Sequence, residues 1–198
     1  ARALAILAPE QRKALYGEAL LRDRGEYRAE QPFEKLMRDA PARSGLDRAQ
    51  YADLKFWLPG DILTKVDRTS MAVSLEAREP LLDHHLVEFA ACLPQARRVS
   101  GTEGKFALKR AMAGDLPGDI LHRAKQGFVL PIAQWFRTDL KDAARAAARS
   151  ERLLDTGWFE PQALSRLAED HISGRRDHAR ELWQLLMLER NLSLLGNK

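Results

Sequence analysis

Residues 58–83 read LPGDILTKVDRTSMAVSLEAREPLLD, a stretch in which charges are threaded through apolar residues. Lys65 and Arg68 are three residues apart, so on a helix they share one strip of the surface. An ordinary solvated helix separates its charged and apolar faces more cleanly than this. Two interpretations stay open at this point: half-buried ion pairs, or a site for an anionic ligand.

The rest of the chain is predicted to be mostly helical, because apolar residues recur at helical spacing and no convincing alternating strand run is present. Asp61 is expected to cap a helix over residues 62–70, and Asp83 a helix over residues 84–93. The fold class is therefore mainly α, and the 198 residues are expected to form a single domain (residues 1–198). Further helices are expected over residues 10–21, 31–40, 46–58, 103–113, 120–123, 139–150, 161–172 and 179–195, the last of them largely buried.

Composition narrows the class of protein. With 45% hydrophobic and 30% charged residues, the chain is globular rather than disordered. The net charge of +4 is too small and too scattered to argue for nucleic acid binding. No apolar run approaches a membrane span and no signal peptide is recognisable, so a cytoplasmic location is expected. The chain begins without Met, so we expect it to be a piece of a longer protein.

Metal and phosphate motifs are missing from the sequence. Cys92 is the only cysteine, which excludes internal disulfides and Cys-rich zinc sites, and we expect it in the core. His84 and His85 lack the spacing of a metal pair, and no metal ligand is predicted. Neither a Walker-type GxxxxGK loop nor GxGxxG is present. The remaining histidines, equally unsupported as ligands, are His122, His171 and His178.

Three charged features have competing interpretations. Lys65 and Arg68 fit surface ion pairs, worth under about 1 kcal/mol each. Glu76 and Arg78 fit a buried bridge that pins an irregular loop, essential to the fold without touching a ligand. Lys125 is the better candidate for a ligand contact, because it lies in the loop-like run KQGF and a mobile point charge suits phosphate.

Three strings together resemble one family. LPGDILTKVDRTSMAVSLEAREPLLD, GKFALKRAM (residues 104–112) and LPGDILHRAKQGFVLPIAQWF (residues 116–136) resemble the C-terminal part of the synthetase domain of glutamine-hydrolysing asparagine synthetases. The resemblance runs over residues 51–136, with weaker agreement in the flanking helices. Among these proteins, the chain looks most like the bacterial asparagine-synthetase-like amidotransferases.

The resemblance implies an adenine-nucleotide α-hydrolase-like (ATP-pyrophosphatase) α/β domain, of which this chain is the helical C-terminal portion. It implies ATP and Mg²⁺ as cofactors: ATP activates the aspartate carboxylate as an acyl-adenylate, and Mg²⁺ neutralises the leaving pyrophosphate. Ammonia channelled from a glutaminase domain then displaces AMP. The implied partners are these small molecules and the upstream domains of the parent chain, and an isolated piece is expected to self-associate into a homo-oligomer.

The resemblance also implies roles for individual residues, according to the motif position that each one occupies. Lys125 matches the KQGF lysine, expected to meet the phosphates and stabilise the transition state. Arg68 matches an arginine on the nucleotide and pyrophosphate side, with Lys65 in a supporting position. Glu76 and Arg78 match an E-x-R that shapes the acyl-acceptor side. The resemblance thus implies catalytic roles for Lys125, Glu76 and Arg68, and nucleotide contacts for Lys125, Arg68 and Lys65.

The sequence also departs from the family pattern. It has no N-terminal catalytic cysteine, no SGGxDS pyrophosphate loop and no acidic GDGGDE-like run, so these are expected upstream of Ala1 and the piece alone is predicted not to adenylate anything. Glu79 and Leu81 stand where the family usually has Val and Phe. Lys105 matches a lysine that is either phosphate-facing or structural. Two alternatives remain: a related adenylating amidotransferase or β-lactam synthetase-like ligase with another acid acceptor, and a helical interaction module.

Overall fold

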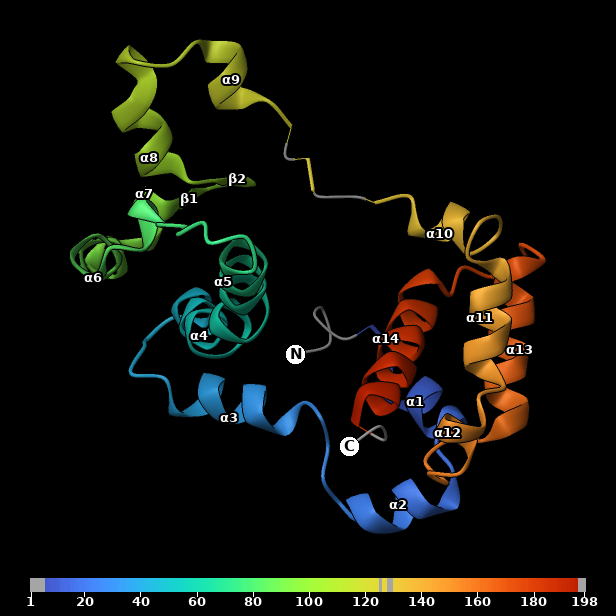
Figure 1. Cartoon of the computed structure of the whole chain (residues 1–198). Helices are drawn as coiled ribbons and strands as arrows, with labels where there is room; N and C mark the ends of the chain where they lie inside the picture. Colours follow the sequence, from blue (N-terminus) through green and yellow to red (C-terminus); the bar gives the residue numbers. More distant parts are fainter. Residues whose placement is uncertain (1–5, 125, 128–129, 196–198) are drawn as a thin grey trace. The chain divides into compact units, whose positions relative to one another are not determined.

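The computed structural model describes residues 6–124, 126–127 and 130–195. Figure 1 follows the chain from its N-terminal helices in blue to its C-terminal helix in red. The prediction of a mainly α protein is confirmed, because the described residues form helices and a single two-stranded hairpin. Among the described helices, none combines the length and the apolar character that a membrane crossing requires.

The chain divides into two compact units. We call residues 1–30 with 128–198 the bundle unit, and residues 31–127 the central unit. The helices of the bundle unit are α1 (Pro9–Leu15), α2 (Glu18–Arg24), α10 (Ile132–Trp135), α11 (Lys141–Ala148), α12 (Glu151–Leu154), α13 (Pro161–Ile172) and α14 (Ala179–Leu195).

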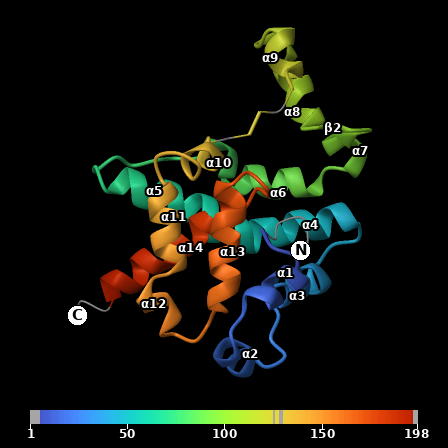
Figure 2. The same ribbon diagram turned by 90° about the vertical axis from the view of Figure 1, so that its right-hand side faces the viewer.

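The bundle unit has a closed hydrophobic core. Helices α11, α13 and α14 lie side by side in both views, and α12 closes one end (Figures 1 and 2). Leu164, Leu167 and His171 recur at helical spacing on α13 and turn inward, which is the pattern of a helix that buries one face. The fully buried side chains that fill this core include Phe136, Leu153, Leu164, Leu182 and His171.

A backbone clasp ties the two chain segments of the bundle unit together. Tyr16 and Phe159 form an antiparallel bridge. The Gly17 N–H donates to the Trp158 carbonyl at 2.8 Å, and the Glu160 N–H donates to the Leu15 carbonyl at 2.9 Å. Helix α1 ends before the extended residue Tyr16, and Gly17 is the N-cap of α2, so the single helix predicted over residues 10–21 is wrong.

The central unit is built from short elements. Its helices are α3 (Gln31–Asp39), α4 (Gly45–Ala52), the π-helix η1 (Asp53–Leu63), α5 (Thr64–Met71), the 3-10 turn η2 (Pro80–Leu82), α6 (His84–Cys92), α7 (Gln95–Arg98), α8 (Phe106–Ala111), the 3-10 turn η3 (Met112–Gly114) and α9 (Gly118–His122), and its strands are β1 (Val99–Ser100) and β2 (Glu103–Gly104).

A helical path runs through α4, η1 and α5 without a break. The predicted stop at Pro59 and the N-cap at Asp61 are both wrong: Pro59 lies inside η1. A proline removes one backbone donor from a helix, yet the chain continues through this position as a π-helix. The Asp61 carboxylate instead accepts from Lys65 at 3.3 Å. The cap predicted at Asp83 is confirmed, because its Oδ1 accepts the N–H groups of His85 and Leu86.

Two further expectations about burial are wrong. Cys92 is exposed rather than in the core, and no residue of α6 is buried. In α14, predicted to be largely buried, the side chains of Trp183 and Leu195 remain exposed. Both predictions fail for the same reason. The spacing of apolar residues defines one face of a helix, but that face is buried only where a neighbouring element covers it.

Candidate functional site

The two cations predicted to face a nucleotide lie on α5. Arg68 is 82% exposed and pairs only loosely with Asp67, at 3.8 Å. Lys65 is 61% exposed and pairs with Asp61, one turn earlier. These are solvated pairs, so the half-buried alternative is wrong for both, and each contributes little to stability. Both cations are consequently free to exchange their present partners for an anionic ligand.

The turn that follows α5 sets the direction of the Glu76 segment. The Leu75 N–H donates to the Ser70 carbonyl and the Ser74 N–H to the Met71 carbonyl, both at 3.0 Å, which is the Schellman pattern of a helix end. Ser74 takes the left-handed position of this turn, with φ of 58°. Glycine is usual there, because a Cβ makes this conformation unfavourable.

Glu76 and Arg78 form an exposed pair, with 3.0 Å between the Arg78 Nε and the Glu76 Oε1. Their side chains are 67% and 81% exposed. The prediction of a buried structural bridge at this point is therefore wrong. Both groups present their charge to solvent in the extended segment between the α5 turn and η2.

Lys125 lies outside the described residues, and its predicted contact with the phosphates stays a prediction. In the described residues that precede Lys125, an ionic cluster that was not predicted from the sequence joins β2, α8 and α9. Glu103 on β2 accepts from Lys109 at 2.7 Å and lies 3.3 Å from the Nδ1 of His122, the last residue of α9. The hydrogen bond from Lys109 is the main cause that lowers the pKa of Glu103. Lys105, at the start of α8, has a left-handed φ of 60°.

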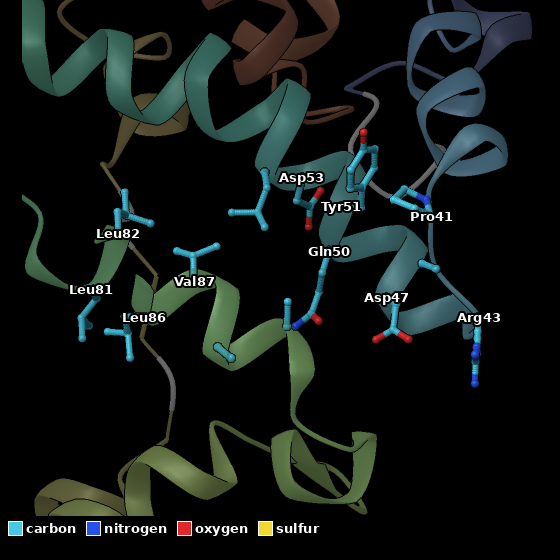
Figure 3. Close-up of a pocket in the computed structure, with 14 residues that line it drawn as sticks. Pro41, Arg43, Asp47, Gln50, Tyr51, Asp53, Leu81, Leu82, Leu86 and Val87 are labelled. Atoms are coloured by element: carbon cyan, nitrogen blue, oxygen red, sulfur yellow. The ribbon is translucent and has the colours of Figure 1, made fainter. Parts of the chain in front are cut away.

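A cavity of about 680 Å³ lies between α4 with η1 on one side and η2 with α6 on the other. In Figure 3, Gln50 and Asp53 face Leu82 and Val87 across it. Leu81 also lines it and is 64% exposed. The lining residues are Pro41, Ala42, Arg43, Asp47, Gln50, Tyr51, Asp53, Leu54, Leu81, Leu82, Leu86, Val87, Ala90 and Ala91.

One polar end of this cavity is fixed by Arg98. Its guanidinium forms an ion pair with Asp47 and donates to Gln50 at 2.6 Å, joining α7 to α4. The Arg98 hydrogen bond, helped by Ser44, lowers the pKa of the Asp47 carboxyl. The charge of Asp47 is neutralised by Arg98, and most of the other residues that line the cavity are apolar.

The exposed cations of α5 have the chemistry of an anion contact. Within the parts of the chain that the structure describes, no group of three His, Cys, Asp or Glu residues is placed to hold a metal ion. Lys65 and Arg68 could be two of several contacts to a polyphosphate. Both side chains are exposed, and both lie on α5, less than two helical turns apart. They do not form an enclosed phosphate cradle.

Comparison with known proteins supplies the family. A family model described as asparagine synthase matches residues 2–193. A putative glutamine-hydrolyzing asparagine synthetase of Mycobacterium bovis is 40% identical over 144 residues, covering 71% of this chain and 21% of the relative. The glutamine-hydrolyzing asparagine synthetase 1 of Bacillus subtilis is 30% identical over 149 residues, covering 75% of this chain and 23% of the relative.

A mammalian relative also matches. The glutamine-hydrolyzing asparagine synthetase of Bos taurus is 32% identical over 143 residues, covering 62% of this chain and 24% of the relative. No solved structure gives a significant match. The chain thus spans between a fifth and a quarter of the length of these curated relatives. Since the family model matches nearly the whole sequence, the chain belongs to the asparagine synthase family.

Proposed function

We propose that this chain forms the C-terminal helical part of the synthetase domain of a glutamine-dependent asparagine synthetase, and that residues 1–198 belong to that one domain. The parent protein would activate the aspartate side-chain carboxylate with ATP, release pyrophosphate, and aminate the acyl-adenylate with ammonia derived from glutamine. The family match over residues 2–193 is the observation that carries this proposal.

Within that reaction, Lys125, Arg68 and Lys65 would contact the phosphates. The exposure of Arg68 and Lys65 supports this role, because neither is engaged in a tight ion pair that ligand binding must break. Glu76 would lie on the acceptor side, where its exposed pairing with Arg78 leaves the carboxylate accessible. Mg²⁺ would neutralise the charge of the leaving pyrophosphate, with its ligands in another part of the parent chain.

The surface of the central unit supports a covering partner, which we propose to be the remainder of the synthetase domain. Val73, Leu75 and Phe89 are 75%, 62% and 63% exposed, and α6 buries none of its residues. Fully burying a side chain of this size contributes about 1.5–3 kcal/mol. A partner that covers several of them would therefore add a large part of a domain's stability.

The test replaces Lys125 by Ala in the full-length chain, with free ammonia as nitrogen donor so that glutamine hydrolysis does not limit the rate. Loss of one preorganised charge at a developing oxyanion lowers kcat by roughly 10²–10³, measured as pyrophosphate release and asparagine formation. Lys35→Ala is the matched control, since Lys35 is an exposed lysine of α3 that pairs with Asp39.

Equal turnover in the Lys125→Ala, Lys35→Ala and unmodified proteins would remove the phosphate role from Lys125. Mass spectrometry of the product identifies the acid that accepts nitrogen, and an amide other than asparagine would reassign the chain to a related ligase. The isolated 198-residue chain is expected to show no calorimetric ATP binding. Micromolar affinity for ATP with Mg²⁺ would contradict the proposal that the nucleotide grip lies elsewhere.

A further inference from the structure

Ser74 holds a strained backbone conformation in the turn that ends α5. Its φ of 58° is left-handed, a conformation that a Cβ makes unfavourable. In the described chain, Ser74 and Lys105 are the two residues other than glycine with a positive φ, and both lie in strings that carry the family resemblance. Strain of this kind clusters at functional sites. Here it falls between Arg68 and Glu76, two residues of the proposed function.

Side-chain packing does not hold the segment that leaves this turn. Every residue from 71 to 79 is exposed. A turn of this type is often closed by an apolar contact of the residue at the position of Leu75, yet Leu75 is 62% exposed. Among the described residues, the N–H groups of residues 76–79 make no backbone hydrogen bond. The direction in which this segment leaves α5 therefore depends on the backbone of the turn itself.

Backbone hydrogen bonds link Arg68 to the turn. The carbonyl of Arg68 accepts the Ala72 N–H at 3.1 Å, in the last turn of α5. The carbonyl of Ser70 accepts the Leu75 N–H at 3.0 Å and so closes the turn. Glu76 follows directly in the sequence. The hydrogen-bonded backbone thus runs from the cation on the nucleotide side almost to the carboxylate on the acceptor side.

The φ of Ser74 decides where Glu76 stands relative to α5. Residues with a Cβ usually adopt negative φ values. A rotation of φ from 58° into that range would carry the Leu75 N–H away from the Ser70 carbonyl. Glu76 lies two residues beyond the rotated bond, at most about 7 Å of extended chain. Its carboxylate would therefore move by several ångströms relative to Arg68.

We propose that Ser74 is a positioning residue, whose left-handed backbone fixes the acceptor-side carboxylate of Glu76 relative to the phosphate contact of Arg68. This inference rests on the proposed function, since it needs both of these residues to act in the reaction. Reacting atoms must come within about 3–3.5 Å of each other, so the spacing of the groups that hold the acid and the nucleotide controls the rate. Ser74 acts through its backbone conformation and not through its hydroxyl.

Three substitutions in the full-length protein separate the conformation of the turn from the chemistry of the side chain. Ser74→Gly removes the hydroxyl but keeps the turn, because glycine adopts positive φ without a Cβ clash. Ser74→Val opposes the turn, because a β-branched residue rarely adopts positive φ. Ser100→Val is the matched control, since Ser100 is an exposed serine of β1 whose φ is not positive.

The positioning role predicts that the two Ser74 variants differ. With Ser74→Val, kcat for pyrophosphate release falls by about ten- to a hundredfold, and the KM for the acid acceptor rises. The KM for ATP stays unchanged, because Arg68 precedes the turn and keeps its place on α5. Hydrogen exchange quickens in peptides that cover residues 70–78. Ser74→Gly and Ser100→Val keep the kcat and both KM values of the unmodified protein.

A purely structural role of the turn predicts a different result. Ser74→Val would then lower only the folded fraction, with kcat per folded molecule and both KM values unchanged, and that result would overturn the inference. Equal kinetic losses in Ser74→Gly and Ser74→Val would overturn it as well. If Ser74→Val does not fold, Ser74→Thr takes its place, because it keeps the hydroxyl and adds the branch at Cβ. A KM for the acid acceptor and a kcat equal to those of Ser74→Gly would then contradict the positioning role.

The Glu76→Gln variant separates the positioning role from the proposed function. If Glu76→Gln abolishes turnover while the Ser74 variants leave kcat and the KM for the acid acceptor intact, the proposed function stands and the positioning role falls. If Glu76→Gln has no effect on turnover, the acceptor-side role of Glu76 and the positioning role of Ser74 both fall.

Discussion

The clasp at Gly17 gives a quantitative test of how the bundle unit is held together. A Cβ at this position would stand 2.4 Å from the carbonyl oxygen of Gly157 and 3.2 Å from the Phe159 carbonyl carbon. These are backbone atoms, so no side-chain rotation relieves the contact. To restore ordinary packing, the Gly157 carbonyl must move by roughly 1 Å, and its neighbour Trp158 carries the acceptor for the Gly17 N–H.

The expected cost of Gly17→Ala combines three effects. Overpacking costs about 1–3 kcal/mol, and loss of a clasp hydrogen bond adds about 1 kcal/mol. The smaller conformational freedom of Ala in the unfolded chain returns about 0.4–1 kcal/mol. The net destabilisation is therefore about 2 kcal/mol, which lowers the melting temperature of a unit of this size by roughly 8–16 °C.

Urea unfolding followed by circular dichroism measures the global effect, and hydrogen exchange at the amides of Gly17 and Glu160 measures the clasp itself. Gly45→Ala is the matched control, because a Cβ there meets nothing within 4 Å and replaces glycine in the first turn of α4. A Gly17→Ala protein that unfolds at the midpoint of the unmodified chain, with both amides still protected, would refute the close approach of residues 17 and 157.

Three further outcomes are expected. Arg145 donates to both oxygens of Glu169 and lowers the pKa of that carboxyl. The pair therefore stabilises the bundle at neutral pH, and this small gain is lost progressively as the pH falls below the ordinary Glu value of 4.5 and through the lowered pKa. The difference in urea midpoint between unmodified and Glu169→Gln protein should be largest at pH 7 and shrink as the pH falls below 4.5. Ser74→Gly should be more stable than Ser74→Ala by about 1 kcal/mol, since φ is 58° there, and equal melting temperatures would contradict that geometry. Cys92 should react with a thiol reagent in the native isolated chain, because it is exposed, and should be protected in the full-length protein if the proposed partner covers α6.

Local sequence rules predicted helix content well and helix boundaries less well. Asp83 works as an N-cap because its carboxylate needs only the next two or three N–H groups, which lie within one turn. Asp61 meets the same local rule and fails, since the chain before it is already helical and its N–H groups have partners. Whether Pro59 ends a helix or sits inside a wider one depends on how the turns on either side pack, which a sequence pattern does not contain.

The candidate site was reached through family motifs rather than through spacing. Residue spacing alone did not distinguish between surface ion pairs and an anion site at Lys65 and Arg68. The exposed ion pairs seen in the structure are compatible with both interpretations. His171 gave no signal, because a lone histidine among apolar residues is typical of a core position. Its hydrogen bond to the Ala133 carbonyl, 38 residues away, and its ring contact with Phe136 are set by tertiary structure.

The contrast between α14 and α6 shows why burial is harder to predict than helicity. Both carry apolar residues at helical spacing, yet Leu182 is 1% exposed in α14 whereas Phe89 is 63% exposed in α6. Leu182 is covered because α11 and α13 pack beside α14 within the same unit. Since hydrophobic stabilisation depends on area removed from water, α6 contributes its share only when another surface covers it. The folding of the central unit alone therefore does not account for the apolar sequence of α6, and the covering partner proposed above would account for it.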